Sequence, residues 1–68
     1  MNNFGKILKK IRTERGLSAK DIAKGIGVHY ATILNWEKGK GKPTLLPLIK
    51  LSIFLNVKAD VLLGIKKT

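Results

Sequence analysis

The segment best suited to bind another molecule is GVHYATILNWEKGKGKP, which occupies positions 27–43. A tyrosine, an alanine and an asparagine open its short apolar pattern, and lysine alternates with glycine near its end. An amide side chain donates and accepts hydrogen bonds at the same time, and lysine ammonium groups attract anions. These groups favour binding over covalent chemistry, and they suit a partner that carries many negative charges.

The charge balance of the whole chain supports a polyanionic partner. Lys and Arg number 14 against four Asp and Glu, which gives a formal charge of +10 over 68 residues. Nucleic acid is the first candidate for such a field, and an anionic membrane surface or an acidic protein are the alternatives. Because 44% of the residues are hydrophobic, a disordered polycation is disfavoured and the chain is expected to fold.

Enzyme chemistry has little support in the composition. With no cysteine, one histidine and four acidic residues, the chain lacks thiolate groups and has few ligands for any other metal site. We expect no catalysis, metal, cofactor or small-molecule substrate. The start MNNFGK has no long apolar core, and no run approaches the roughly 18 apolar residues of a membrane span. We therefore expect a single cytoplasmic domain over residues 1–68, with no membrane partner.

The spacing of apolar residues predicts an all-α protein. The first amphipathic stripe consists of Phe4, Ile7, Leu8 and Ile11. Gly16 is expected to end that helix, and Ser18 with Asp21 forms a short capping box that starts the next. Helices are expected over residues 3–15, 18–25, about 29–38, 44–56 and 59–63.

Residues 19–36 have the spacing of two short helices joined by a tight turn. Ala23 is small enough for two helices to cross there, and Gly27, four residues later, permits a sharp turn. The other apolar residues of the two inner faces are Ile22, Ile26, Val28, Ile33 and Trp36. The pattern predicts a helix-turn-helix motif over about 18–38, although similar helix pairs also occur in bundles that bind no DNA.

The chain also resembles the Cro and cI type of phage repressors, the XRE-like helix-turn-helix family. The resemblance lies in the segments IRTERGLS, DIAKGIGV, TILNWEKGK, KPTLLPLIKLS and ADVLLG, in that order. It implies a five-helix, lambda-repressor-like domain whose third helix binds operator DNA. It further implies a sequence-specific regulator of transcription, a repressor that binds a pseudo-palindromic operator in double-stranded DNA as a homodimer.

In this family the start of the third helix faces the base edges of the major groove. The matching positions here are Tyr30, Ala31, Leu34 and Asn35. The Asn35 amide can bond adenine N6 and N7 together, while Ala31 and Leu34 suit a thymine methyl group. Alternatives stay open: Tyr30 and Asn35 can belong to an ordinary solvated face, and Leu34 can pack against another helix.

Other polar residues are expected to hold the DNA backbone. The expected phosphate-binding residues are Ser18, Lys20, His29, Lys38, Lys40 and Lys42. The loop lysines can follow the phosphates while the glycines let the main chain approach them, and the alternative is a flexible solvated loop. Ser18 can also cap a helix, which is compatible with a phosphate contact, and His29 can be a substitute cap at the surface.

Three positions depart from the family pattern, one of them His29, which stands where the family often has a serine or threonine cap. Ala19 stands where the family commonly has a glutamine that braces a base-reading side chain. This brace is expected to be absent, so that DNA affinity depends more on lysines such as Lys20 and Lys10. Gly25 replaces a better helix former and suggests a looser end of the second helix. The family also pairs an arginine with a glutamate, and the matching residues Arg12 and Glu37 are expected to form a structural ion pair.

The C-terminal third has more apolar residues than one buried stripe requires. The stripe expected to face the core is Leu45, Leu48, Ile49, Leu51, Ser52 and Leu55. The surplus and the apolar residues after it form the expected dimer interface: Leu46, Ile53, Phe54, Val57, Val61 and Ile65. Alternatively, Phe54 and Val61 complete a small core. The same surface leaves open an antitoxin-like or anti-repressor-like module that binds a different protein, with DNA binding secondary.

Overall fold

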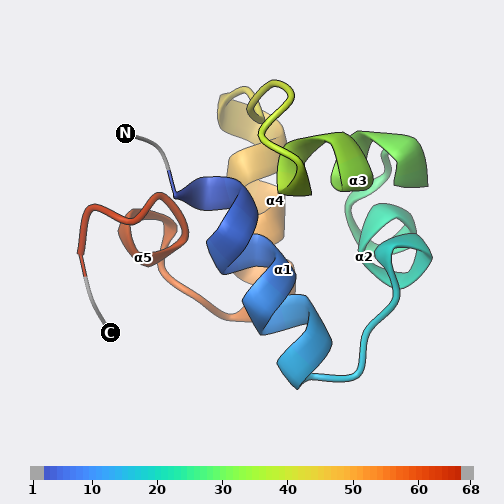
Figure 1. The fold of residues 1–68 in the computed structure, drawn as a ribbon, viewed down its shortest axis with the longest axis horizontal. Coiled ribbons are helices and arrows are strands. Elements are labelled where there is room, and N and C mark those ends of the chain that lie inside the picture. Colours follow the sequence, from blue (N-terminus) through green and yellow to red (C-terminus); the bar gives the residue numbers. More distant parts are fainter. Residues whose placement is uncertain (1–2, 67–68) are drawn as a thin grey trace.

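Five helices make up the regular structure of residues 3–66, the part of the chain that the computed structural model describes (Figure 1). The helices are α1 Phe4–Glu14, α2 Ala19–Ile26, α3 Tyr30–Glu37, α4 Leu45–Leu55 and α5 Ala59–Leu62. No residue of this range lies in a strand. The prediction of an all-α protein with five helices is confirmed, and the observed helix ends closely follow the expected ones.

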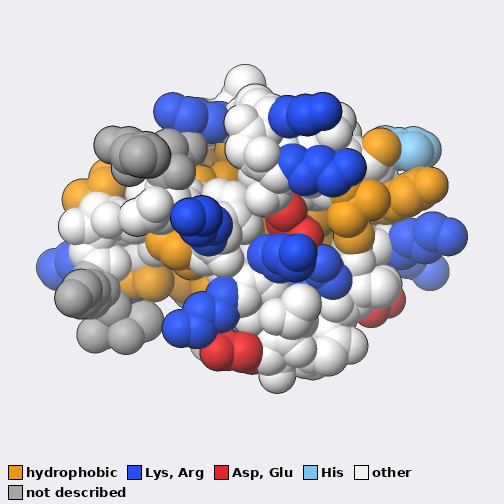
Figure 2. All heavy atoms as spheres, viewed as in Figure 1, with side chains coloured by type: hydrophobic (Ala, Val, Ile, Leu, Met, Phe, Trp, Pro, Cys, Tyr) orange, Lys and Arg blue, Asp and Glu red, His pale blue; other side chains and the backbone are white. Residues whose placement is uncertain are grey.

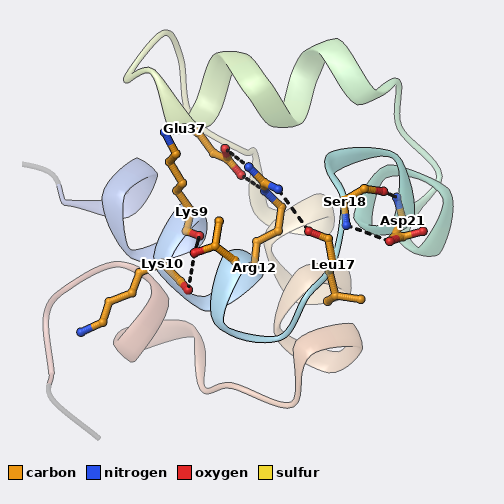
Figure 3. A network of polar contacts seen from close by, with 8 residues as sticks. Lys9, Lys10, Arg12, Leu17, Ser18, Asp21 and Glu37 are labelled. Carbon is orange, nitrogen blue, oxygen red and sulfur yellow. Dashed lines mark hydrogen bonds and ion pairs between the residues drawn. The ribbon is translucent and has the colours of Figure 1, made fainter.

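The ends of α2 are set by local sequence. Ser18 Oγ accepts a hydrogen bond from the Asp21 N–H at 3.0 Å, and Asp21 Oδ2 accepts one from the Ser18 N–H at 2.8 Å (Figure 3). At the other end Gly27 is left-handed, with φ of 76°, and its N–H donates to the Ala23 carbonyl oxygen at 2.8 Å. Because of these two caps, α2 begins and ends at defined residues and the chain turns directly into α3.

A single apolar core lies where the helices meet. Its buried residues are Phe4, Leu8, Ala19, Ile22, Ala23, Ile26, Ile33, Trp36, Leu51, Leu55 and Leu62. The rings of Phe4 and Trp36 meet edge to face, with their centroids 6.1 Å apart. Helix α3 packs against α1 and α2, and α4 packs against α2 and α5. Of the two helices of the helix-turn-helix motif, α3 is therefore supported by α1, and α2 is supported by α4.

The predicted buried stripe of α4 is wrong at two positions. Leu45 is 72% exposed and Ile49 is 41% exposed, whereas Leu51 and Leu55 are fully buried. Only a narrow seam of α4 faces its neighbours α2 and α5, and Leu48 lies at the margin of that seam. Because nearly every side chain of α4 is apolar, the sequence pattern does not mark which side of the helix faces inward.

Gly25 has a packing role that the expected loosening of α2 did not anticipate. The helix continues through Gly25 to Ile26. A Cβ atom at Gly25 would lie 2.6 Å from Cδ1 of Phe54, so the aromatic ring rests where a side chain would otherwise be. The missing side chain thus allows α2 and α4 to approach closely.

Candidate nucleic-acid interface

An ion pair fixes the C-terminal end of α3 to α1. Arg12 Nε and Nη2 donate to the two carboxylate oxygens of Glu37 at 2.6 and 2.9 Å (Figure 3). Arg12 Nη1 also donates to the Leu17 carbonyl oxygen at 3.1 Å. The hydrogen bond to Glu37 raises the pKa of the Arg12 guanidinium, against a smaller lowering by burial. Since the pair is bidentate and the Glu37 side chain is only 4% exposed, it constrains the orientation of α3.

Gly5 allows the same end of α3 to lie directly on α1. Gly5 is buried, and a Cβ atom there would collide with the Trp36 carbonyl oxygen and lie 2.9 Å from that of Glu37. Only glycine therefore fits at this crossing. Sequence reasoning missed this residue, although a glycine inside an otherwise good helix pattern is a signal for a close approach.

The N-terminal part of α3 presents an exposed face. Tyr30 is 41% exposed, and Ala31 and Asn35 are also exposed. Leu34 is half-buried and packs against the core, while Ile33 and Trp36 are buried on the opposite side of the helix. Three of the four residues expected to read bases thus have accessible side chains. The fourth, Leu34, is partly covered by the core and partly exposed to solvent.

His29 caps the start of this helix. Its Nδ1 atom accepts a hydrogen bond from the Ala31 N–H at 3.1 Å, so this nitrogen carries no proton in the capped form. The cap role that was one alternative for His29 is present in the structure. In a neutral ring the other nitrogen, Nε2, then carries the proton and is the hydrogen-bond donor.

Lys20 of α2 lies beside the first residue of α3. Its Nζ atom is 5.3 Å from the centre of the Tyr30 ring, and the His29 ring stacks on the same tyrosine with centroids 4.9 Å apart. The ends of the two motif helices therefore bring together an ammonium group, an imidazole and a phenol.

Exposed cations flank the α3 face. Lys20, Lys38, Lys40 and Lys42 all have exposed side chains. Figure 2 shows Lys and Arg side chains gathered over α1 and near the loop that joins α3 to α4, with few acidic side chains between them. Ser18 is exposed at the start of α2, where its hydroxyl serves the capping box. A surface of this kind attracts an extended polyanion.

The residues expected to form a dimer interface divide into two groups. In the first group Leu46, Ile53 and Ile65 are 59%, 74% and 76% exposed. Phe54 also belongs to it, with 42% of its surface exposed and its ring packed against Gly25. Val57 and Val61 are half-buried, and Val57 packs against the core. On α4 itself the exposed apolar side chains at Leu45, Leu46, Ile49 and Ile53 form one continuous surface, called here the apolar α4 face.

Among residues 3–66, no group of three or more His, Cys, Asp or Glu side chains is placed to hold a metal ion. None of the helices in this range has the length and apolarity needed to cross a membrane. 

A model of the helix-turn-helix family HTH_3 matches residues 8–62, which include the whole α2–turn–α3 unit. The chain belongs to this helix-turn-helix family. The resemblance to Cro and cI type phage repressors is thereby confirmed, because the relatives include phage-derived regulators.

Two relatives and one solved structure illustrate the similarity. The SPbeta prophage-derived HTH-type transcriptional regulator YonR of Bacillus subtilis is 42% identical over 88% of this chain and 56% of its own length. The cryptic phage CTXphi transcriptional repressor RstR of Vibrio cholerae is 35% identical over 96% of this chain and 59% of its own. This chain thus spans little more than half the length of either relative.

The solved structure is the restriction-modification controller protein C.AhdI from Aeromonas hydrophila. It superposes with a TM-score of 0.82 at 28% identity, and the match covers 88% of this chain and 91% of that one. The similarity thus extends over most of this chain.

Proposed function

We propose that this chain is a transcriptional regulator that binds double-stranded DNA in a sequence-specific manner, and that it acts as a repressor. The observation that carries the proposal is the exposed N-terminal face of α3. The Arg12–Glu37 ion pair anchors this helix at its C-terminal end, and exposed lysines flank the face. The names of the relatives YonR and RstR, a transcriptional regulator and a transcriptional repressor, support the same function.

Base reading is assigned to the exposed face of α3. Asn35 is exposed and can form a bidentate pair with adenine, and Ala31 is exposed and suits a thymine methyl group. Tyr30 can direct its hydroxyl to a base edge or a phosphate. Leu34 contributes the part of its apolar surface that the core does not cover.

Phosphate binding is assigned to residues around that face. Lys20, Lys38, Lys40 and Lys42 supply exposed ammonium groups, which set affinity and register without reading sequence. Ser18 adds a hydroxyl at a helix start. His29 caps α3 through Nδ1, so a neutral ring has Nε2–H available for a phosphate oxygen.

The apolar α4 face is assigned to a second copy of the chain. Contiguous exposed apolar residues usually mark an interface, and a twofold dimer would present two copies of α3 about 34 Å apart, one turn of DNA. Ile65 and Phe54 are further exposed apolar residues that we assign to the same interface. The same exposure favours one other candidate, an antitoxin-like or anti-repressor-like module in which the face binds a different protein.

In this proposal residues 1–68 form one DNA-binding domain that works in the cytoplasm without catalysis, metal, cofactor or small-molecule substrate.

Selection from random double-stranded DNA tests the function. The proposal predicts recovery of a pseudo-palindromic site with half-sites one helical turn apart. Recovery of a single half-site together with a monomer in solution would favour the partner-module candidate, and no enrichment at any salt concentration would contradict sequence-specific binding.

A further inference from the structure

Tyr30 is held by two neighbours at the junction of α2 and α3. The Lys20 Nζ atom lies 5.3 Å from the ring centroid, within the range of a cation–π interaction. The His29 ring stacks on Tyr30 at 4.9 Å with an interplanar angle of 27°. His29 is itself fixed, because its Nδ1 atom accepts the Ala31 N–H.

These contacts act on a side chain that would otherwise be loosely placed. Tyr30 is the first residue of α3 and is 41% exposed, so the helix alone leaves its ring several rotamers. An ammonium group beside the ring and a stacked imidazole favour one of them. The phenolic oxygen is then presented from a more defined position.

The neighbouring position on α2 offers no alternative support. Ala19 is 8% exposed and carries only a methyl group, so it has no polar atom to brace a residue of α3. Lys20, the next residue, is exposed and reaches the tyrosine ring. Ala19 therefore cannot supply the family's glutamine brace, and Lys20 contacts Tyr30 from the next position of the helix.

We propose that Lys20 is a positioning residue for DNA reading, which holds the Tyr30 ring and thereby sharpens the sequence preference of α3. This inference rests on the proposed function. A cation–π contact uses the charge of the ammonium group and leaves its N–H donors for a phosphate oxygen. Lys20 thus links a backbone contact to the orientation of a base-reading side chain.

A simple phosphate contact by Lys20 would behave differently. Removing such a contact weakens binding to all duplexes alike and does so whether or not Tyr30 is present. A positioning role instead makes the loss depend on Tyr30 and on the DNA sequence. A double-mutant cycle between the two residues separates these roles.

The cycle uses Lys20→Gln, Tyr30→Leu and the double variant, titrated against the selected duplex and single-base substitutions of it. We expect Lys20→Gln to reduce discrimination by about two- to fivefold, the size of an exposed cation–π interaction. In the Tyr30→Leu background this loss of discrimination disappears. Lys20→Arg retains the discrimination, since a guanidinium also stacks on aromatic faces. Lys24→Gln, which removes an exposed charge from the same helix, serves as the matched control.

A measurement without DNA tests the contact itself. In NMR spectra of the free protein, the Lys20 ε-methylene protons should show a ring-current shift that Tyr30→Leu abolishes and Lys24→Gln leaves unchanged. Absence of the shift overturns the brace whatever the DNA result. Equal loss for Lys20→Gln in both tyrosine backgrounds overturns the positioning role while leaving the proposed function intact. If the shift is present but the wild-type protein prefers no duplex, the proposed function fails and the reading role of Lys20 fails with it.

Discussion

Helices α3 and α4 differ in what they expose to solvent. The exposed side of α3 carries Tyr30, Ala31 and Asn35 with lysines around it, whereas α4 exposes leucines and isoleucines. The first surface suits a charged and hydrogen-bonding partner, and the second suits another apolar surface. The comparison shows that one small domain exposes two surfaces of opposite chemistry.

The two helices are also held in different ways. Helix α3 buries Ile33 and Trp36 in the core, and its orientation is fixed in addition by the bidentate Arg12–Glu37 ion pair and by its close approach to Gly5. Apolar burial of Leu51 and Leu55 holds α4, and Arg15 donates a hydrogen bond to the Leu55 carbonyl oxygen at its end. A surface that must match base edges requires the fixed orientation that directional contacts provide, while an apolar face tolerates small adjustments.

Removing the ion pair should have the largest effect. Arg12→Ala leaves the buried Glu37 carboxylate without its partner, and we expect the free energy of unfolding to fall by about 3–5 kcal/mol. Chemical denaturation followed by circular dichroism measures this change. Lys9→Ala removes an exposed charge from the same helix and is the control, expected to stay within about 0.5 kcal/mol of wild type. A loss of less than about 1 kcal/mol for Arg12→Ala would refute the anchoring role.

Adding one methyl group at the α1–α3 crossing should have the next largest effect. In Gly5→Ala the new Cβ atom would push against the backbone of Trp36 and Glu37, and we expect a loss of about 1–3 kcal/mol. Lys6→Ala on the exposed side of α1 is the matched control. Thermal unfolding distinguishes the two variants, and equal melting temperatures would show that α3 can move away from α1 without cost.

A charge on the apolar α4 face should break self-association. Ile53 is 74% exposed, so Ile53→Lys leaves the core intact but places an ammonium group in the proposed interface. We expect the dimer dissociation constant to rise by at least about tenfold, or ~1.4 kcal/mol, in sedimentation equilibrium. Lys50→Gln, an exposed change on the same helix, should leave it unaffected. A dimer of unchanged affinity in Ile53→Lys would move the interface elsewhere.

A loop lysine should affect the salt dependence of DNA binding. If the exposed Lys40 neutralises a phosphate, Lys40→Ala lowers the slope of log affinity against log salt by about 0.9 and weakens binding to all duplexes alike. Lys58→Ala, at the start of α5, is the control with an unchanged slope. The same slope in both variants would remove Lys40 from the phosphate contacts.

The smallest effect concerns the capping box of α2. Two hydrogen bonds hold the pKa of Asp21 below its usual value of 3.8. The larger effect comes from the Ser18 N–H and the smaller from the Ser18 hydroxyl. A lowered folded-state pKa means that the contribution to stability is present above about pH 4 and is lost as the pH falls through the depressed pKa. Asp21→Asn should therefore flatten the decline of stability below pH 4. Denaturation curves between pH 2 and 6 that decline equally in both proteins would contradict this account.

The features that could be predicted from the sequence depend on local patterns. The capping box of Ser18 and Asp21 lies within one turn, and Gly27 ends α2 through its own backbone geometry. The accessible face at Tyr30 and Asn35 follows from the positions of the buried residues Ile33 and Trp36, because helical periodicity places the two sets on opposite sides of α3.

The features that could not be predicted depend on how helices meet. In α4, Leu45 and Leu48 are equivalent in the sequence pattern, and only packing against α2 and α5 separates the exposed from the half-buried one. The close approach of Gly25 to Phe54 joins residues far apart in the chain, and a single glycine in a sequence does not indicate which residue packs against it. The Lys20–Tyr30 contact likewise requires the angle between α2 and α3.

The most direct test of DNA reading by α3 is a titration of Asn35→Ala against the selected duplex and against every single-base substitution of it. We predict a loss of discrimination of about 1–3 kcal/mol at one base pair in each half-site, with the preference at other positions preserved. An equal loss of affinity for all duplexes, including random ones, would contradict the assignment of the exposed face of α3 to base reading.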